Sequence, residues 1–176
     1  MVTKFLLSWV LGGMTAFMPL AAIEAPAAAQ PQSIVVLGGG SGALTSALYL
    51  ARAGLQPIVI EGHTPGGLLT QSHSVQNWPG ELEIEGQALM QKVRAHAEAS
   101  GARFLQQEVV EVDFSKRPFV LKTKSLQGGN KTQNVVAESC IIAMGTTPNF
   151  LGVPGEQDYW GHGVTNCAIC DGSLYR

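Results

Sequence analysis

Two cysteines near the C-terminal end of the sequence have the spacing of a redox pair. Cys167 and Cys170 are separated by two residues, and Asp171 follows them directly. At this spacing two thiols can close a small disulfide ring, and one thiolate can attack a partner's disulfide while the other resolves the mixed disulfide. A neighbouring carboxyl group can give a proton to the departing thiolate or take one from the attacking thiol. The pattern predicts thiol–disulfide exchange, with Cys167, Cys170 and Asp171 as the catalytic group.

The same region offers a second interpretation, a small metal site. Its ligands would be Cys167, Cys170, His162 and Asp171. A structural zinc site usually has four nitrogen or sulfur ligands in paired spacing, and this set has only two thiolates. The sequence therefore favours redox chemistry, and we predict no metal site. The third cysteine, Cys140, lies in an apolar run and is expected to pack in the core.

A glycine-rich turn lies near the start of the globular part. Residues 33–37 form a short β-branched run, which predicts a buried parallel strand. Residues 38–43 then read Gly-Gly-Gly-Ser-Gly-Ala, a G-x-G-x-x-A pattern. Strong helix formers follow over 43–53, and a second apolar run covers 57–61. This order predicts a strand–helix–strand unit with the glycines at its first turn.

Such a turn can bind the phosphates of a dinucleotide. Gly38 permits a tight turn, Gly40 lets the backbone approach a pyrophosphate, and Ala43 lets the helix pack closely. The helix N-terminus presents unpaired N–H groups to the phosphates. Glu61 closes the second strand, where a carboxylate can accept hydrogen bonds from ribose hydroxyls. We therefore expect an FAD or NAD site in preference to NADP. The alternative is a glycine-rich turn without a ligand.

The remaining sequence predicts an α/β domain with a β-meander. The expected elements are a loop over 63–80, a helix over 85–100, a strand over 103–113, and meander arms over 118–124 and 134–144. The 176 residues suffice for one domain, or one domain and part of another. The net charge of −2 and the absence of a basic stripe argue against a nucleic-acid partner.

Residues 1–29 differ from the rest of the chain. Lys4 precedes a mostly apolar stretch over 5–20, and the segment ends in three alanines at 27–29. These features are typical of a secretory signal peptide. We expect cleavage here, which would make the mature protein periplasmic or exported and leave it without a membrane anchor. The alternatives are an uncleaved anchor or an extension from a mistaken start codon, and in the last case the protein would be cytoplasmic.

Taken together, five stretches resemble the low-molecular-weight thioredoxin reductase family in the same order. They are GGGSGA at 38–43, PIVIEG at 57–62, GGLLTQSHSVQNWPG at 66–80, IIAMGTTPNFLGVPGE at 141–156 and GVTNCAICDG at 163–172. The resemblance implies a Rossmann-like, three-layer FAD-binding α/β fold with a β-meander. It also implies electron transfer from NADPH through FAD to the Cys167–Cys170 disulfide and on to a thioredoxin-like protein disulfide.

The resemblance also implies roles for individual residues and a division into domains. Residues 30–150 would be a partial FAD-binding domain, and residues 151–176 would begin the NADPH and redox domain. Cys170 would face the flavin, and Cys167 would attack thioredoxin. The residues that would bind FAD are Gly38, Gly40, Ser41, Gly42, Ala43, Glu61, Gly62, Gly66, Gly67, Leu68, Asn77, Val109 and Gly145.

The sequence departs from the family pattern in three respects. Leu68 stands where the family usually has Gln, and Met144 replaces the Thr of the family's Ala-Thr-Gly turn. The third departure is that no second G-x-G-x-x-A unit for NADPH follows, so we expect the chain to be truncated before the NADPH-binding domain. We expect a homodimer, or a complementing second chain that completes the enzyme. The alternative function is a non-catalytic remnant of an FAD- or nucleotide-binding domain.

Overall fold

A computed structural model describes residues 32–128 and 131–172. The expected export signal at residues 1–29 lies outside these described residues, as do two residues of the loop that joins the meander arms. Within the described ranges, every helix is too short or too polar to cross a bilayer.

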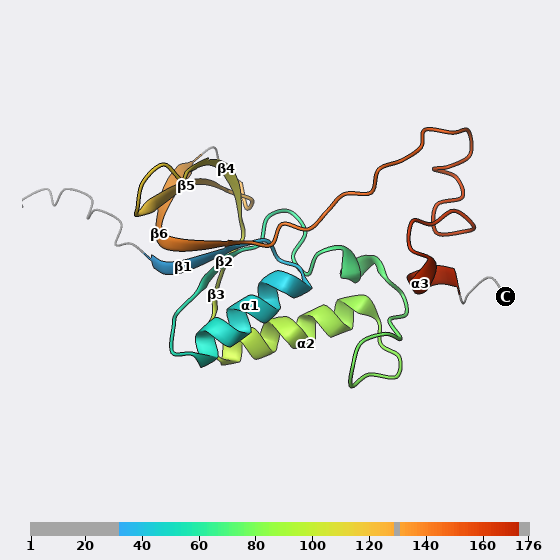
Figure 1. The fold of residues 1–176 in the computed structure, drawn as a ribbon, viewed down its shortest axis with the longest axis horizontal. Coiled ribbons are helices and arrows are strands. Elements are labelled where there is room, and N and C mark those ends of the chain that lie inside the picture. Colours follow the sequence, from blue (N-terminus) through green and yellow to red (C-terminus); the bar gives the residue numbers. More distant parts are fainter. Residues whose placement is uncertain (1–31, 129–130, 173–176) are drawn as a thin grey trace, which may run out of the picture.

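A six-stranded mixed sheet forms the centre of the molecule (Figure 1), with the strand order β3-β2-β1-β6-β5-β4. The strands are β1 (Gln32–Leu37), β2 (Ile58–Ile60), β3 (Arg103–Leu105), β4 (Gln107–Asp113), β5 (Phe119–Ser125) and β6 (Thr132–Ile142). Strands β3, β2, β1 and β6 are parallel, whereas β4, β5 and β6 are antiparallel. The long strand β6 belongs to both parts, because Ala137 pairs with β5 and also with β1.

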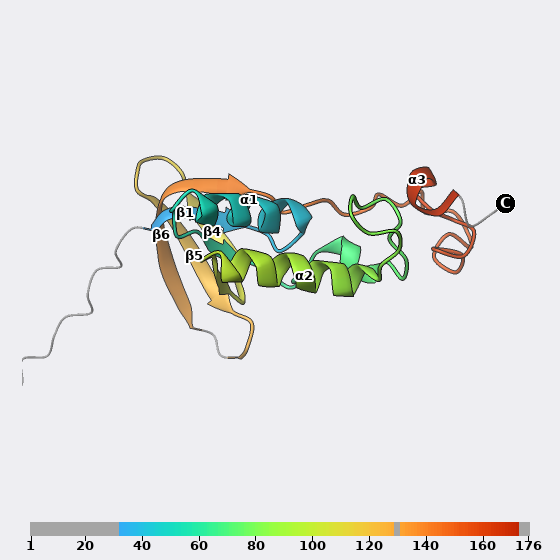
Figure 2. The ribbon, with the colours of Figure 1, turned by 90° about the horizontal axis from the view of Figure 1, so that it is seen from below.

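Side chains along the parallel strands point alternately into two separate cores, one on each face of the sheet. Helices α1 (Ser41–Arg52) and α2 (Gly86–Ala99) cover one face of the parallel strands, and the meander curls over the other (Figures 1 and 2). Val36 and Val59 face the helices and pack against alanines of α1 and α2. Val35 and Leu37 face the meander and pack against residues such as Leu121. Because neighbouring strand residues point to opposite faces, a continuous apolar run builds a three-layer fold.

These elements confirm the predicted α/β fold with a β-meander and correct one strand. The expected strand over 103–113 is two strands, β3 and β4, separated at Gln106. The first pairs in parallel with β2 and the second antiparallel with β5, so the chain changes partners within an uninterrupted strand-like sequence. Cys140 is half-buried on β6 and packs against the meander-side core, and this burial raises the pKa of its thiol.

Candidate cofactor pocket and redox disulfide

A pocket of about 710 Å³ opens at the carboxyl ends of β1 and β2. Its size lies within the range of ligand sites, about 300–1,000 Å³, and this end of a parallel sheet is where such folds bind ligands. Eleven of the residues predicted to bind a cofactor line it: Gly38, Gly40, Ser41, Gly42, Glu61, Gly62, Gly66, Gly67, Leu68, Val109 and Gly145.

The glycine turn forms one wall of this pocket, and its glycines have different roles. Gly38 has φ +116°, and a Cβ there would lie 2.2 Å from the carbonyl oxygen of Ala143. Gly40 has ordinary extended backbone, and the nearest atom to a Cβ placed there would be 3.8 Å away. Gly42 would meet nothing within 4 Å. Gly38 is therefore required by the protein's own packing, whereas Gly40 and Gly42 leave room on the pocket side.

The start of α1 presents backbone donors to this space. Gly40 is the N-cap and provides no side-chain hydrogen bond, and the first turn of α1 contains no acidic residue. The first N–H groups of a helix lack intrahelical partners and carry a partial positive charge. An uncapped helix start beside an open glycine turn fits the pyrophosphate of a dinucleotide such as FAD.

A second glycine pair brings the loop after β2 against the phosphate turn. Gly66 donates its N–H to the carbonyl oxygen of Gly39 at 2.9 Å. A Cβ at Gly67 would lie 2.8 Å from the Cα of Gly40. The two loops therefore touch backbone to backbone, and a side chain at Gly67 would separate them. Leu68 and Met144, the two departures from the family pattern, also line the pocket with mostly exposed apolar side chains.

Glu61 is held by Arg94, a residue that no sequence pattern identifies as part of the site. Its carboxylate is fully buried and accepts hydrogen bonds from Arg94 Nε at 3.0 Å and Arg94 Nη2 at 3.2 Å. The guanidinium also stacks on Phe104, with Cζ 4.1 Å from the ring centroid. The hydrogen bonds to Glu61 raise the pKa of Arg94. A carboxylate has about four acceptor positions, and the two hydrogen bonds to Arg94 do not use all of them. The side chain is closed off in this structure, so it would have to open toward the pocket before a ribose hydroxyl could reach the others.

Two predicted cofactor residues lie outside the pocket lining. Ala43 is fully buried in the core between α1 and the sheet, because its position on the first turn of α1 faces the strands. Asn77 is exposed in the loop before α2, which is tied by the Val75–Ile84 bridge. Ala43 therefore contributes close helix packing in this structure, and Asn77 does not reach the pocket.

The two cysteines form a disulfide on a separate segment. Cys167 and Cys170 are bonded, with their Cα atoms 5.3 Å apart, at the start of the short helix α3 (Ala168–Asp171). The backbone N–H of Cys170 donates to the Cys167 sulfur at 3.3 Å. Cys170 is exposed and Cys167 is half-buried. A donor on the Cys167 sulfur would stabilise negative charge there after reduction, as expected for an attacking thiolate.

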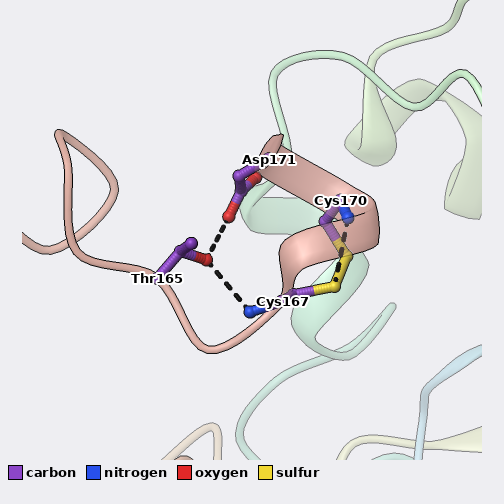
Figure 3. The surroundings of a disulfide bond; sticks show 4 residues. All are labelled: Thr165, Cys167, Cys170 and Asp171. Atoms are coloured by element: carbon purple, nitrogen blue, oxygen red, sulfur yellow. Dashed lines mark hydrogen bonds between the residues drawn. A yellow bond between two sulfur atoms is a disulfide. The ribbon is translucent and has the colours of Figure 1, made fainter. Parts of the chain in front are cut away.

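Thr165 links Asp171 to this cysteine pair (Figure 3). Its Oγ1 donates to Asp171 Oδ2 and accepts from the backbone N–H of Cys167 at 3.1 Å. In Figure 3 the Asp171 carboxylate lies on the Thr165 side of the helical turn, away from the two sulfur atoms. The position of Asp171 after the cysteine pair predicts an acid or base, whereas nothing in the spacing identifies Thr165.

The disulfide segment stands apart from the pocket. None of the pocket-lining residues is Cys167, Cys170 or Asp171. An extended stretch after β6 leads to the red segment that carries α3 (Figure 1). Hydrogen bonds within that segment stabilise it: the Glu156 carboxylate accepts hydrogen bonds from the N–H groups of Leu151 at 2.9 Å and Gly152 at 2.7 Å. The structure thus assembles a cofactor pocket and a redox group separately.

The described residues do not bring together a set of ligands for a metal ion. Residues 32–128 and 131–172 contain no group of three or more His, Cys, Asp or Glu side chains that could hold a metal ion. The two candidate thiolate ligands, Cys167 and Cys170, are bonded to each other.

Known proteins have similar sequences. Residues 32–175 match the family described as pyridine nucleotide-disulphide oxidoreductase. The chain is 41% identical over 148 residues to a thioredoxin reductase of Coxiella burnetii, covering 84% of this chain and 44% of that relative. It is 38% identical over 144 residues to a glucosaminate ammonia-lyase of Pseudomonas fluorescens, covering 81% of this chain and 43% of that relative.

Solved structures share the fold as well. A thioredoxin reductase from Giardia duodenalis has a TM-score of 0.70 and 35% identity, covering 82% of this chain and 46% of that chain. The chain therefore spans less than half the length of each of these three relatives. The mixed sheet matches the FAD-binding part of thioredoxin reductase structures. With a thioredoxin reductase-like domain over residues 32–175, the chain belongs to the pyridine nucleotide-disulphide oxidoreductase family.

Proposed function

We propose that the chain supplies the FAD pocket and the redox disulfide of a thioredoxin reductase-like flavoprotein. Its substrate would be the disulfide of a thioredoxin-like protein. The observation that carries this proposal is the combination, on one chain, of a pocket walled by an uncapped glycine turn and a disulfide with an adjacent carboxyl group. FAD, when bound in this pocket, would supply a two-electron carrier.

The residues of the pocket would act by binding and orienting the cofactor. N–H groups at the start of α1 would hold the pyrophosphate, and the open face at Gly40 would let it approach the backbone. Glu61, already fixed by Arg94, would accept a hydrogen bond from the adenosine ribose. Val109 would approach the adenine from β4. Each role uses a residue that lines the pocket.

The cysteines would perform the exchange with the protein substrate. In the reduced chain, the Cys167 thiol loses its proton to solvent, and the thiolate attacks one sulfur of the partner's disulfide, whose S–S bond breaks as a mixed disulfide forms. Asp171 gives a proton to the departing partner thiolate. The Cys170 thiol then loses its proton and attacks the Cys167 sulfur, and the S–S bond of the mixed disulfide breaks. The second partner sulfur leaves and takes up a proton from solvent, and the Cys167–Cys170 disulfide is restored. Two electrons pass from the cysteine pair to the partner, which leaves as a dithiol.

The Cys167–Cys170 disulfide must come close to the cofactor pocket before it can be reduced again. In this structure the segment that carries α3 is joined to β6 by residues 143–149, which have no regular secondary structure. We propose that this stretch allows the redox segment to change position relative to the sheet. Cofactor binding by the sheet and exchange by the cysteines can therefore be tested separately.

FAD binding tests the first part of the proposal. Equilibrium dialysis of the 176-residue chain against FAD, with FMN as the matched control, measures binding to the pocket. We expect FAD to bind at least about tenfold more tightly than FMN, because FMN lacks the adenosine and one phosphate that Glu61 and the glycine turn would contact. A folded chain that binds neither flavin, or binds both equally, would contradict an FAD pocket and favour a non-catalytic remnant.

A further inference from the structure

The hydroxyl of Thr165 is engaged in two directions. A threonine hydroxyl has one proton to donate and lone pairs with which to accept. At Thr165 the proton goes to Asp171 Oδ2, while a lone pair accepts the N–H of Cys167. One side-chain atom therefore joins the backbone of the first redox cysteine to the carboxylate that follows the second (Figure 3).

The hydrogen bond from Thr165 Oγ1 to Asp171 Oδ2 fixes the Asp171 side chain. Among residues 32–128 and 131–172, Thr165 is the one hydrogen-bond partner of the Asp171 carboxylate. Asp171 is half-buried, whereas Cys170 beside it is exposed. The β-branched side chain of Thr165 has few χ1 rotamers, so its hydroxyl stays in place with little loss of entropy. Without the hydroxyl, the carboxylate would lose its position relative to the cysteines.

We propose that Thr165 is a positioning residue for thiol–disulfide exchange, which acts by holding the Asp171 carboxylate at a fixed place beside the Cys167–Cys170 turn. The inference rests on the proposed function, because it needs Asp171 to move a proton during exchange. The carboxylate lies on the Thr165 side of the turn, away from the two sulfur atoms of this chain, so in this proposal it serves the departing sulfur of the partner and not Cys167 or Cys170. A carboxylate that rotates freely would spend less time at the place where that sulfur leaves. Thr165 itself touches neither sulfur.

The test uses reduced chain and glutathione disulfide at pH 7. The pair gives two electrons to glutathione disulfide, forming the Cys167–Cys170 disulfide and two glutathione thiols. The rate is followed by the mass of the peptide that contains both cysteines, so that Cys140 does not contribute. Thr165→Val keeps the side-chain shape without the hydroxyl, and Thr165→Ser keeps the hydroxyl. Thr165→Ala provides a second deletion in case the valine does not fit.

We expect Thr165→Val and Thr165→Ala to slow exchange about tenfold, since general acid–base groups contribute about 10²–10⁴-fold to a rate. Thr165→Ser keeps the hydroxyl, so its rate should stay within about twofold of the unchanged chain. In the Asp171→Asn background, Thr165→Val should add no further loss. If Asp171→Asn alone leaves the rate unchanged, the proton-transfer role in the proposed function is wrong. If Asp171→Asn slows exchange but Thr165→Val does not, or slows it equally in both backgrounds, the positioning role of Thr165 is overturned.

Discussion

Gly38 meets two constraints at once, a positive φ of +116° and the carbonyl oxygen of Ala143 at 2.2 Å from a would-be Cβ. Both come from the protein's own backbone, because the turn after β1 packs against the chain leaving β6. A pattern that is usually explained by ligand binding is therefore also a folding requirement at this residue. Gly40 lacks both constraints, so its effect on binding can be separated from its effect on stability.

Replacing Gly38 by Ala should lower the free energy of unfolding by about 3 kcal/mol, from overpacking and an unfavourable φ together. The measurement is urea denaturation. Gly42→Ala is the matched control, because its Cβ would meet nothing within 4 Å. It should change stability by less than about 1 kcal/mol, the size of a helix-propensity effect. Equal destabilisation by both substitutions would show that the close contact at Gly38 is unimportant.

The residues of the glycine turn could be predicted from the sequence, because their spacing is local. Glu61 could be predicted for the same reason, since it closes the strand that follows. Arg94 could not, because its partner lies 33 positions away and its other ion-pair partner, Glu98, gives it the pattern of an exposed helix pair. Asn77 was assigned from the family resemblance alone, and the structure leaves it exposed away from the pocket.

At the scale of elements, α2 does more than cover the sheet. It carries Arg94, which pairs with the fully buried carboxylate at the end of β2 and stacks on Phe104 of β3. A buried carboxylate without its partner is costly, whereas an exposed ion pair contributes little. Helix α2 thus fixes the Glu61 carboxylate, which would face the ribose. The position of this helix therefore links the pocket to the helical layer of the fold.

Arg94→Met should therefore destabilise the chain by about 3–5 kcal/mol, the cost of leaving a buried charge unpaired. Lys92→Met on the same helix is the control, because its pair with Glu81 is largely exposed, and it should cost less than about 1 kcal/mol. Urea denaturation of both variants gives the comparison. The double variant Glu61→Gln/Arg94→Met should recover part of the loss. Similar stabilities for Arg94→Met and Lys92→Met would contradict the buried pair.

Most element boundaries followed from local signals, with one instructive exception. The strand–helix–strand unit has β-branched runs, glycines and a helix-forming segment in order, so its positions were accessible to prediction. The division between β3 and β4 was not, because residues 103–113 contain no glycine or proline that would mark a break. Pairing with β2 on one side and β5 on the other decides it, and such pairing depends on the tertiary fold.

At the scale of the whole molecule, the fold separates binding from exchange. The three layers form a pocket at one end of the parallel strands. The redox disulfide belongs to α3, whose segment lies beyond β6 and apart from the sheet and its helices (Figures 1 and 2). The family resemblance predicts both groups of residues and places the cysteine pair in a separate domain that begins at residue 151, whereas no local pattern predicts the path of the chain after β6. The account as a whole depends on the pocket holding a dinucleotide.

The most direct measurement is the dissociation constant for FAD of the 176-residue chain and of Gly40→Asp, with urea denaturation of both. Aspartate is a favoured N-cap, and the extended backbone of Gly40 and the 3.8 Å clearance admit it, so stability should stay equal or rise slightly. Its carboxylate would occupy the place of the pyrophosphate and repel it, so FAD affinity should fall at least about 100-fold. Unchanged FAD affinity in a folded Gly40→Asp chain would contradict the account.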